Sequence, residues 1–224
     1  MTDTPTGTLD RVEAALKPLL RGVLHEAAFA ISLVTGTALI CLSPGPLARA
    51  GAITYAASVV LLFGTSAAYH RGRWSPRGHA LMMRLDHSMI FILIAGTYTP
   101  FVLLLLHGTT RVVVFSTVWG GALAGVVARN AVRRTPRWIF VGLYLVLGWT
   151  ALGVLPQLLH AGGVAVLVLL LAGGVCYSAG AVVYATQRPD PSPRWFGFHE
   201  VFHACTLAAF ALHYVAVSLA TYRA

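Results

Sequence analysis

The chain has 224 residues, of which 57% are hydrophobic and only 10% are charged. A soluble domain usually has about 25% charged residues, so this chain lacks the charge to cover an ordinary water-exposed surface. The same composition excludes an intrinsically disordered chain, a coiled coil and a collagen-like fibre. A net charge of +9 would suggest a nucleic-acid partner in a soluble protein. In so apolar a chain it indicates membrane topology instead.

The polar N-terminal segment, residues 1–24, comes first in chain order. It lacks the basic start followed by an apolar run that defines a secretory signal, so we expect it to remain in the cytoplasm. Apolar residues recur in it at helical spacing: Leu9, Val12, Leu16, Leu19 and Val23. A short helix lying at the membrane interface is one interpretation, and a frayed tail is the other.

Apolar stretches about as long as a membrane helix, roughly 20 residues, fill the rest of the chain. We predict seven transmembrane helices, at residues 25–43, 49–70, 80–106, 109–129, 138–156, 162–187 and 198–221. Pro and Gly residues in most of the intervening links are turn signals, and a short turn is expected around His160. The predicted fold class is therefore an all-α membrane protein with one domain, residues 25–221, built as a seven-helix bundle.

Arg and Lys residues fall mostly on one side of this predicted bundle. Thirteen of the 16 lie in the N-terminal segment and around the second, fourth and sixth links, whereas the opposite side has only Arg49, Arg111 and Arg223. Because positive residues accumulate on the cytoplasmic side of membrane proteins, we predict a cytoplasmic N-terminus and an external C-terminus. We expect a multi-pass protein of the cell (inner) membrane, with membrane lipids as partners and no nucleic acid.

Four polar clusters lie within or at the ends of these apolar segments: His25-Glu26, Ser66 to His70, Arg84 to Ser88 and His199 to His203. Ionisable groups inside membrane helices are costly and usually functional. The predicted topology places all four clusters at one depth, near the cytoplasmic face. We therefore expect them to form one site there.

The last cluster has the spacing of metal ligands. His199 and His203 are four residues apart and so share one face of a helix. Two such imidazoles make half of a zinc site, and His70 is the natural third ligand, which leaves a fourth position for water. We predict that these three histidines bind Zn²⁺ and that the zinc activates the water as a nucleophile. Asp86 would act as base or orient the water, and Ser66 would hydrogen-bond the water or the developing oxyanion.

The stretch from His199 to His203 also fits the H-E-x-x-H pattern, in which the glutamate is the general base of a metalloprotease. The pattern is short, and chance matches are common. Only 21 residues follow His203, and His213 is poorly placed as a further ligand. We regard proteolysis as the weaker interpretation and leave open whether Glu200 lies beside the ligands or faces the lipid headgroups.

These residues resemble the haemolysin III group of the progestin and adiponectin receptor (PAQR) family. The matching stretches are GTSAAYH at 64–70, RLDHSMIFILIAGTYTPF at 84–101 and GFHEVFHACTL at 197–207. The resemblance implies seven helices with a cytoplasmic N-terminus, and zinc held by His70, His199 and His203 beside Ser66 and Asp86. The wider superfamily includes alkaline ceramidases, which hydrolyse lipid amides. Bacterial members have a haemolysin label and a link to membrane-fluidity homeostasis.

The function favoured by the sequence is a zinc-dependent intramembrane hydrolase of lipid amides or esters, similar to a ceramidase, whose substrate enters sideways from the bilayer. A non-enzymatic regulator or sensor of membrane homeostasis is the first alternative, and its zinc would be structural and held by four protein ligands. A haemolysin-type cytolysin is the second alternative. The sequence leaves the substrate, the metal's identity and the oligomeric state open.

Overall fold

The computed structural model describes residues 18–132 and 136–223. The predicted interfacial helix falls mostly outside these residues. Within them the chain is helical apart from short links and one isolated bridge between Ser192 and Phe196. The helices are α2 (Val23–Cys41), α3 (Pro46–Arg71), α4 (Pro76–Leu105), α5 (Gly108–Ala131), α6 (Arg137–Gly148), the 3₁₀ helix η1 (Trp149–Val154), α7 (Leu155–Thr186) and α8 (Phe198–Tyr222).

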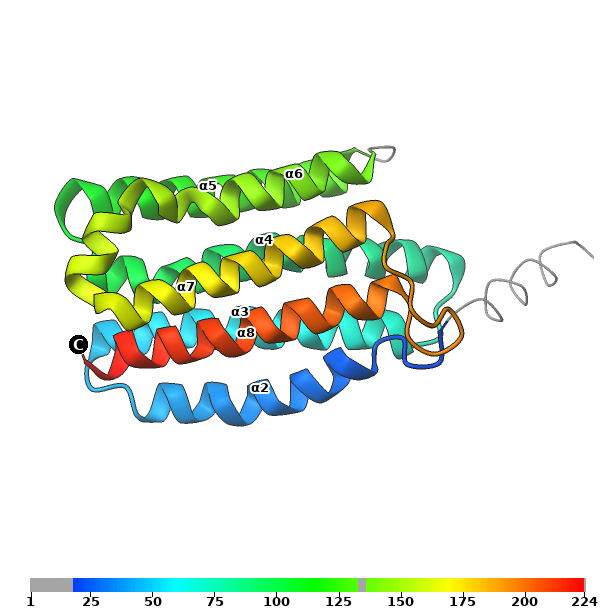
Figure 1. Cartoon of the computed structure of the whole chain (residues 1–224), viewed down its shortest axis with the longest axis horizontal. Coiled ribbons are helices and arrows are strands. Elements are labelled where there is room, and N and C mark those ends of the chain that lie inside the picture. The colour runs from blue at the N-terminus through cyan, green and yellow to red at the C-terminus, as the bar shows by residue number, and fades with distance from the viewer. Residues whose placement is uncertain (1–17, 133–135, 224) are drawn as a thin grey trace, which may run out of the picture.

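The helices form an elongated bundle in which consecutive members run in opposite directions along the long axis (Figure 1). The starts of α2, α4 and α8 and the end of α3 lie at the same end of the bundle, and the C-terminus lies at the other end. All four polar clusters therefore come to one end, as the sequence predicted from short links and alternating direction.

Six helical stretches of the described chain are long and apolar enough to cross a membrane. One of them, Arg137–Thr186, has 50 residues and contains α6, η1 and α7. A straight helix of that length would measure about 75 Å, far more than the roughly 30 Å of a bilayer core. The chain instead reverses direction between the end of α6 and the long part of α7 (Figure 1). The protein is thus a multi-pass membrane protein, while the count of seven crossings and the cytoplasmic N-terminus remain predictions.

The link between α6 and α7 differs from the prediction. We expected one helix to run to residue 156 and a turn around His160, but the α-helix ends at Gly148 and α7 begins at Leu155. His160 lies inside α7, and the break comes at Gly163, whose φ is 77° and ψ is 173°. A side chain strongly disfavours a positive φ, so glycine allows the kink at this point.

Helix α4 begins earlier than predicted because Ser75 and Pro76 provide a strong start. The Ser75 hydroxyl accepts a hydrogen bond from the Gly78 backbone N–H at 3.2 Å, and Pro76 occupies the first helical turn. His79, which we expected in a loop, consequently lies in the first turn of α4, where its ring contacts that of Tyr69. This start places ten residues of helix before Asp86.

Helices α3 and α4 form the interior of the bundle. In their most apolar windows 50% and 61% of the residues are buried, compared with 22% in α5. The outer helices expose large apolar side chains such as Val34, Val127 and Val146. In a membrane protein such side chains face lipid tails, which are as apolar as they are. The polar residues of α3 and α4 are therefore held in the most enclosed part of the molecule.

Gly121 and Gly125 form a small-xxx-small pair on α5, and both lie at helix contacts. An ideal Cβ atom on Gly125 would be 2.4 Å from Cε1 of Phe91 on α4, and one on Gly121 would be 2.7 Å from Cδ1 of Leu147 on α6. Glycine lets neighbouring helices approach closely in a membrane. This pair therefore fixes how α5 packs between α4 and α6.

We expect Gly125→Ala to lower the stability of the folded protein by about 1–3 kcal/mol, because the new methyl group overlaps the Phe91 ring. The measurement is thermal unfolding in detergent. Gly120→Ala is the matched control, since a Cβ atom there meets nothing within 4 Å. Equal melting temperatures for the two variants would contradict the packing role of Gly125.

Candidate metal centre

Three histidines meet at the end of the bundle that holds the polar clusters. His70 lies at the end of α3, and His199 and His203 lie in the first two turns of α8. One candidate ligand atom from each of them lies within 4.8 Å of the others. The Nε2 atoms of His70 and His199 are 3.2 Å apart. Two nitrogens bound to one tetrahedral zinc at 2.0–2.1 Å would be separated by about 3.4 Å, so this pair fits a shared metal ion.

His203 gives a second reason to place a ligand among these rings. Its side chain is only 2% exposed, and its Nδ1 has no hydrogen-bond partner within the described chain. Buried polar atoms in proteins are nearly always paired, because an unpaired one loses its bonds to water without compensation. The donor set of three imidazoles suits zinc, as the sequence predicted, although other transition metals also bind imidazole.

Asp86 approaches the cluster without joining it. In the part of the chain that the structure describes, the group of close ligand atoms contains only the three histidines. Three protein ligands are typical of a catalytic zinc site, which keeps a position for water, whereas structural sites are usually closed by four. The arrangement therefore matches an open site better than a closed one.

Ser66 connects two elements of the site. Its hydroxyl, on α3, is 2.8 Å from Nδ1 of His25 on α2. Ser66 is 2% exposed, so the site holds this hydroxyl away from solvent. Ser66 and Asp86, the two residues predicted to act beside the metal, both line the same cavity as His199 and His203.

His25 is a residue of the site to which the sequence gave no role. Its ring stacks on that of His203, with ring centroids 3.6 Å apart and planes 14° apart. Its position at the same depth as the other polar clusters was the available signal. Because His25 both stacks on His203 and hydrogen-bonds Ser66, it fixes the position of two site residues at once.

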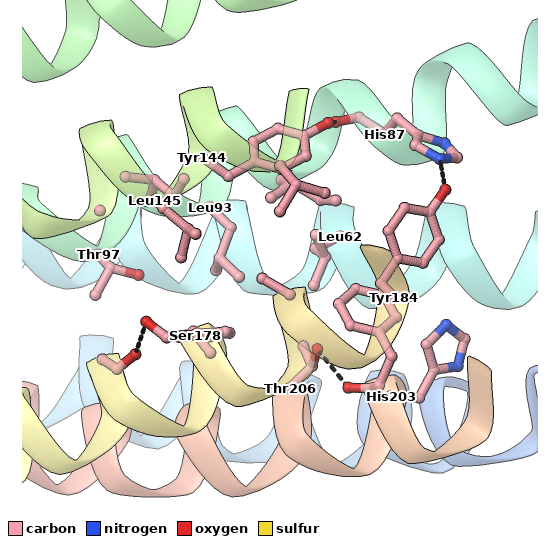
Figure 2. Close-up of a pocket in the computed structure, with 18 of the residues that line it drawn as sticks. Leu62, His87, Leu93, Thr97, Tyr144, Leu145, Ser178, Tyr184, His203 and Thr206 are labelled. Carbon is pink, nitrogen blue, oxygen red and sulfur yellow. Dashed lines mark hydrogen bonds between the residues drawn. The ribbon is translucent and has the colours of Figure 1, made fainter. Parts of the chain in front are cut away.

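His87 does not serve as the main partner of Asp86. Its Nδ1 is 2.7 Å from the Met83 carbonyl oxygen, so this nitrogen must be protonated and donate. Its Nε2 then accepts a hydrogen bond from the Tyr184 hydroxyl at 2.9 Å (Figure 2). A carboxylate oxygen of Asp86 lies 3.6 Å from the same His87 Nδ1, farther away than the Met83 carbonyl oxygen. His87 thus joins α4 to α7.

Glu200 has a structural role that excludes the metalloprotease interpretation. One carboxylate oxygen accepts the Gly197 backbone N–H at 2.9 Å, which caps the start of α8. The other forms a part-buried ion pair with the guanidinium of Arg21. The side chain is 0% exposed. With both oxygens occupied by donors, Glu200 is not free to act as a general base in an H-E-x-x-H site.

Residues 18–22 cover the histidines at this end of the bundle. The backbone N–H groups of Leu19 and Leu20 donate to the carbonyl oxygens of Arg194 and Trp195, so this segment is fastened to the link between α7 and α8. Gly22 has a φ of 85°, and a Cβ atom there would lie 2.6 Å from Cβ of His70. Only glycine therefore permits the segment to pass this close to His70.

A long cavity, partly open to the outside, extends from the site along the bundle. At one end it is lined by Ser66, Asp86 and the α8 histidines, and at the other by Thr97 and Trp149. Between them the lining is mostly leucine, isoleucine and aromatic side chains, several of which are labelled in Figure 2. A mainly apolar cavity with few polar groups at one end is the usual form of a site for a small apolar ligand.

Comparison with known proteins shows the family to which this chain belongs. The sequence profile described as "Haemolysin-III related" matches residues 14–214. The chain is 31% identical to "Hemolysin-3" of Bacillus cereus over 166 residues, which are 73% of this chain and 71% of that protein. It is 37% identical to "Hemolysin-3 homolog" of Bacillus subtilis (strain 168) over 51% of this chain and 54% of the relative. It is 29% identical to "Heptahelical transmembrane protein ADIPOR2" of rice over 65% of this chain and 70% of that protein.

We expect replacement of His70, His199 or His203 by Ala to remove bound metal, because each variant deletes one of three clustered ligand atoms. The measurement is the metal content of the purified protein by inductively coupled plasma mass spectrometry. His160→Ala is the control, since His160 is exposed and distant in sequence from the cluster. Retention of stoichiometric zinc by all three variants would disprove this ligand set.

We expect Glu200→Gln to keep the metal but to destabilise the fold, because it leaves the part-buried Arg21 cation without its charged partner. Losing a hydrogen bond to a charged group typically costs about 1.5–3 kcal/mol. Zinc content and thermal stability of the purified variant measure the two effects. A stable variant that has lost only its zinc would show that Glu200 acts on the metal rather than on the fold.

Proposed function

Because this chain belongs to the haemolysin-III-related family of membrane proteins, we propose that it is a zinc-dependent intramembrane hydrolase of lipid amides or esters, similar to a ceramidase. The observation that supports this function best is the position of Asp86 and Ser66 beside an open cluster of three histidines, at the end of a long apolar cavity. We further propose seven crossings, a cytoplasmic N-terminus and a site near the cytoplasmic face of the inner membrane.

His70, His199 and His203 would hold the zinc, which when bound supplies Lewis-acid polarisation of a carbonyl and activation of water at neutral pH. The protein's own residues would then transfer the proton. Asp86 accepts the proton of the attacking water and returns it to the leaving nitrogen or oxygen as the acyl bond breaks. The products are a fatty acid and an amine or alcohol.

Ser66 would stabilise the negative charge that develops on the carbonyl oxygen. With His25 Nδ1 donating to the serine oxygen, the Ser66 hydroxyl hydrogen is free to point to Asp86 or to the substrate. Preorganised donors of this kind are among the largest contributions to enzymatic acyl transfer. His25 would act through Ser66 as a positioning residue.

The cavity would hold the acyl chain of the lipid. Its leucine, isoleucine and aromatic lining is compatible with a hydrocarbon tail, and its polar end is compatible with the amide or ester group. This places the bond to be broken beside Asp86 while the tail extends toward the other end of the bundle.

Two other functions compete with hydrolysis. A regulator with structural zinc would be favoured by a fourth protein ligand, but the described ligand group has three members. The printed name of the Bacillus cereus relative, "Hemolysin-3", keeps a cytolytic function as the other candidate. Leakage of a dye from liposomes measures that function directly, and leakage that survives His70→Ala would favour it.

We expect Asp86→Asn to lower kcat for fatty-acid release by roughly a hundredfold or more, because general acid–base groups contribute about 10²–10⁴-fold. The zinc content should be unchanged, since Asp86 lies outside the ligand group. Ser66→Ala should lower kcat in the same direction. The assay follows fatty-acid release from ceramides and ester lipids by the purified, zinc-containing protein in lipid vesicles.

His107→Ala is a suitable control in this assay, because His107 is exposed and precedes α5 at the other end of the bundle. Its turnover should equal that of the unaltered protein. Stoichiometric zinc without turnover on any amide or ester lipid would refute hydrolysis and leave the metal site intact.

A further inference from the structure

A second polar position interrupts the cavity far from the histidine cluster. Thr97 on α4 and His213 on α8 both line the main cavity, and both also line a smaller cavity that lies beyond it. They therefore mark the junction of the two. Thr97 is 7% exposed and His213 is 9% exposed, so each side chain is more than nine-tenths buried.

His213 has one nitrogen in use and one without a partner. Its Nε2 is 3.1 Å from the Leu170 carbonyl oxygen, so this nitrogen is protonated and donates. Its Nδ1 is then an acceptor, and no donor in the described chain reaches it. The ring is fixed in this position because it packs against Gly173, where a Cβ atom would lie 2.2 Å from Cδ2 of His213.

Thr97 contributes a hydroxyl group to the same junction (Figure 2). Other helical threonines, such as Thr99 and Thr206, donate to the carbonyl oxygen four residues earlier. Thr97 makes no hydrogen bond to the residues that the structure describes, although a hydroxyl can both donate and accept. The nearby indole of Trp149 and hydroxyl of Ser178 are already paired, the indole N–H donating to the serine at 2.9 Å.

Two polar groups that lack partners in the described chain therefore belong to residues that line this junction: the Nδ1 acceptor of His213 and the hydroxyl of Thr97. A ligand hydroxyl can donate to the first and accept from the second, whereas a ketone or a methylene group has no proton to donate. We propose that this junction binds a hydroxyl group on the middle of the substrate's acyl chain. The substrates would then be amides or esters of mid-chain hydroxy fatty acids, an assignment that rests on the proposed hydrolytic function.

The position of the hydroxyl follows from the helix. His203 and His213 are ten residues apart on α8, which corresponds to about 15 Å along the axis. An extended hydrocarbon chain advances about 1.3 Å per carbon, given a C–C bond of about 1.5 Å. With the carbonyl group beside His203, the junction would be reached after roughly twelve carbons. A hydroxyl close to the carboxyl group would therefore not reach it.

Binding of free fatty acids tests this proposal without requiring turnover. The probes are octadecanoic acid, the same acid with a hydroxyl on about the twelfth carbon, here called the mid-chain hydroxy acid, and the same acid with a hydroxyl next to the carboxyl group. Isothermal titration of the purified zinc-containing protein in detergent gives each Kd. We expect the mid-chain hydroxy acid to bind about tenfold more tightly than the other two, as for two added hydrogen bonds.

In Thr97→Val and His213→Leu the ratio of these dissociation constants should fall to about one, and Thr97→Ser should restore the preference. Thr54→Val is the control, because the Thr54 hydroxyl is exposed and bonds the Ala50 carbonyl oxygen, and it should retain the preference. Equal affinities for all three acids, or a preference that persists in Thr97→Val, would overturn the proposal.

This binding test distinguishes a failure of the proposed hydroxyl site from a failure of the proposed hydrolytic function. A preference for the mid-chain hydroxy acid without any lipid hydrolysis would support the binding site and refute the enzyme. Hydrolysis of unsubstituted lipids with no preference among the three acids would support the enzyme and refute the binding site. If His213→Leu fails to fold, the nearly isosteric Thr97→Val and its rescue by Thr97→Ser still decide the question.

Discussion

The cost of burying polar groups in an apolar medium is the constraint on which the rest of this structure depends. With so little charge in the chain, each ionisable side chain within the helices needs a partner from another helix, because neither lipid nor core can solvate it. His70, His199 and His203 meet this need by converging, and Ser66 meets it by bonding His25. The site therefore forms where helix ends from distant parts of the sequence supply one another's partners.

The same constraint explains why the N-terminal part of the described chain belongs to the site. Glu200 is buried within one helical turn of His199 and His203. Its negative charge is compensated by the backbone N–H of Gly197 at the start of α8 and by Arg21. Arg21 is held in place by backbone hydrogen bonds between its neighbours and the α7–α8 link. A residue that looked like a catalytic base in the sequence motif thus positions the helix that bears the ligands.

The cavity is the other consequence of an apolar interior. Where apolar side chains do not fill the space between α4, α7 and α8, the cavity between them is lined by groups that suit a hydrocarbon chain. The few polar atoms along the cavity therefore indicate where a ligand could bind, since those without a partner in the protein can bond a ligand. Both the histidine end and the junction at Thr97 and His213 stand out on this ground.

The sequence by itself determined the membrane class, the family resemblance, most helix boundaries within a few residues and the three clustered histidines, because hydropathy, turn residues and a four-residue spacing are local signals. Tertiary structure decided what local signals do not contain. It decided that the α-helix of α6 ends at Gly148 and passes into a 3₁₀ helix, that His25 stacks on His203, and that Glu200 pairs with Arg21. These outcomes depend on contacts between residues far apart in the chain, and such contacts exist only once the helices have packed.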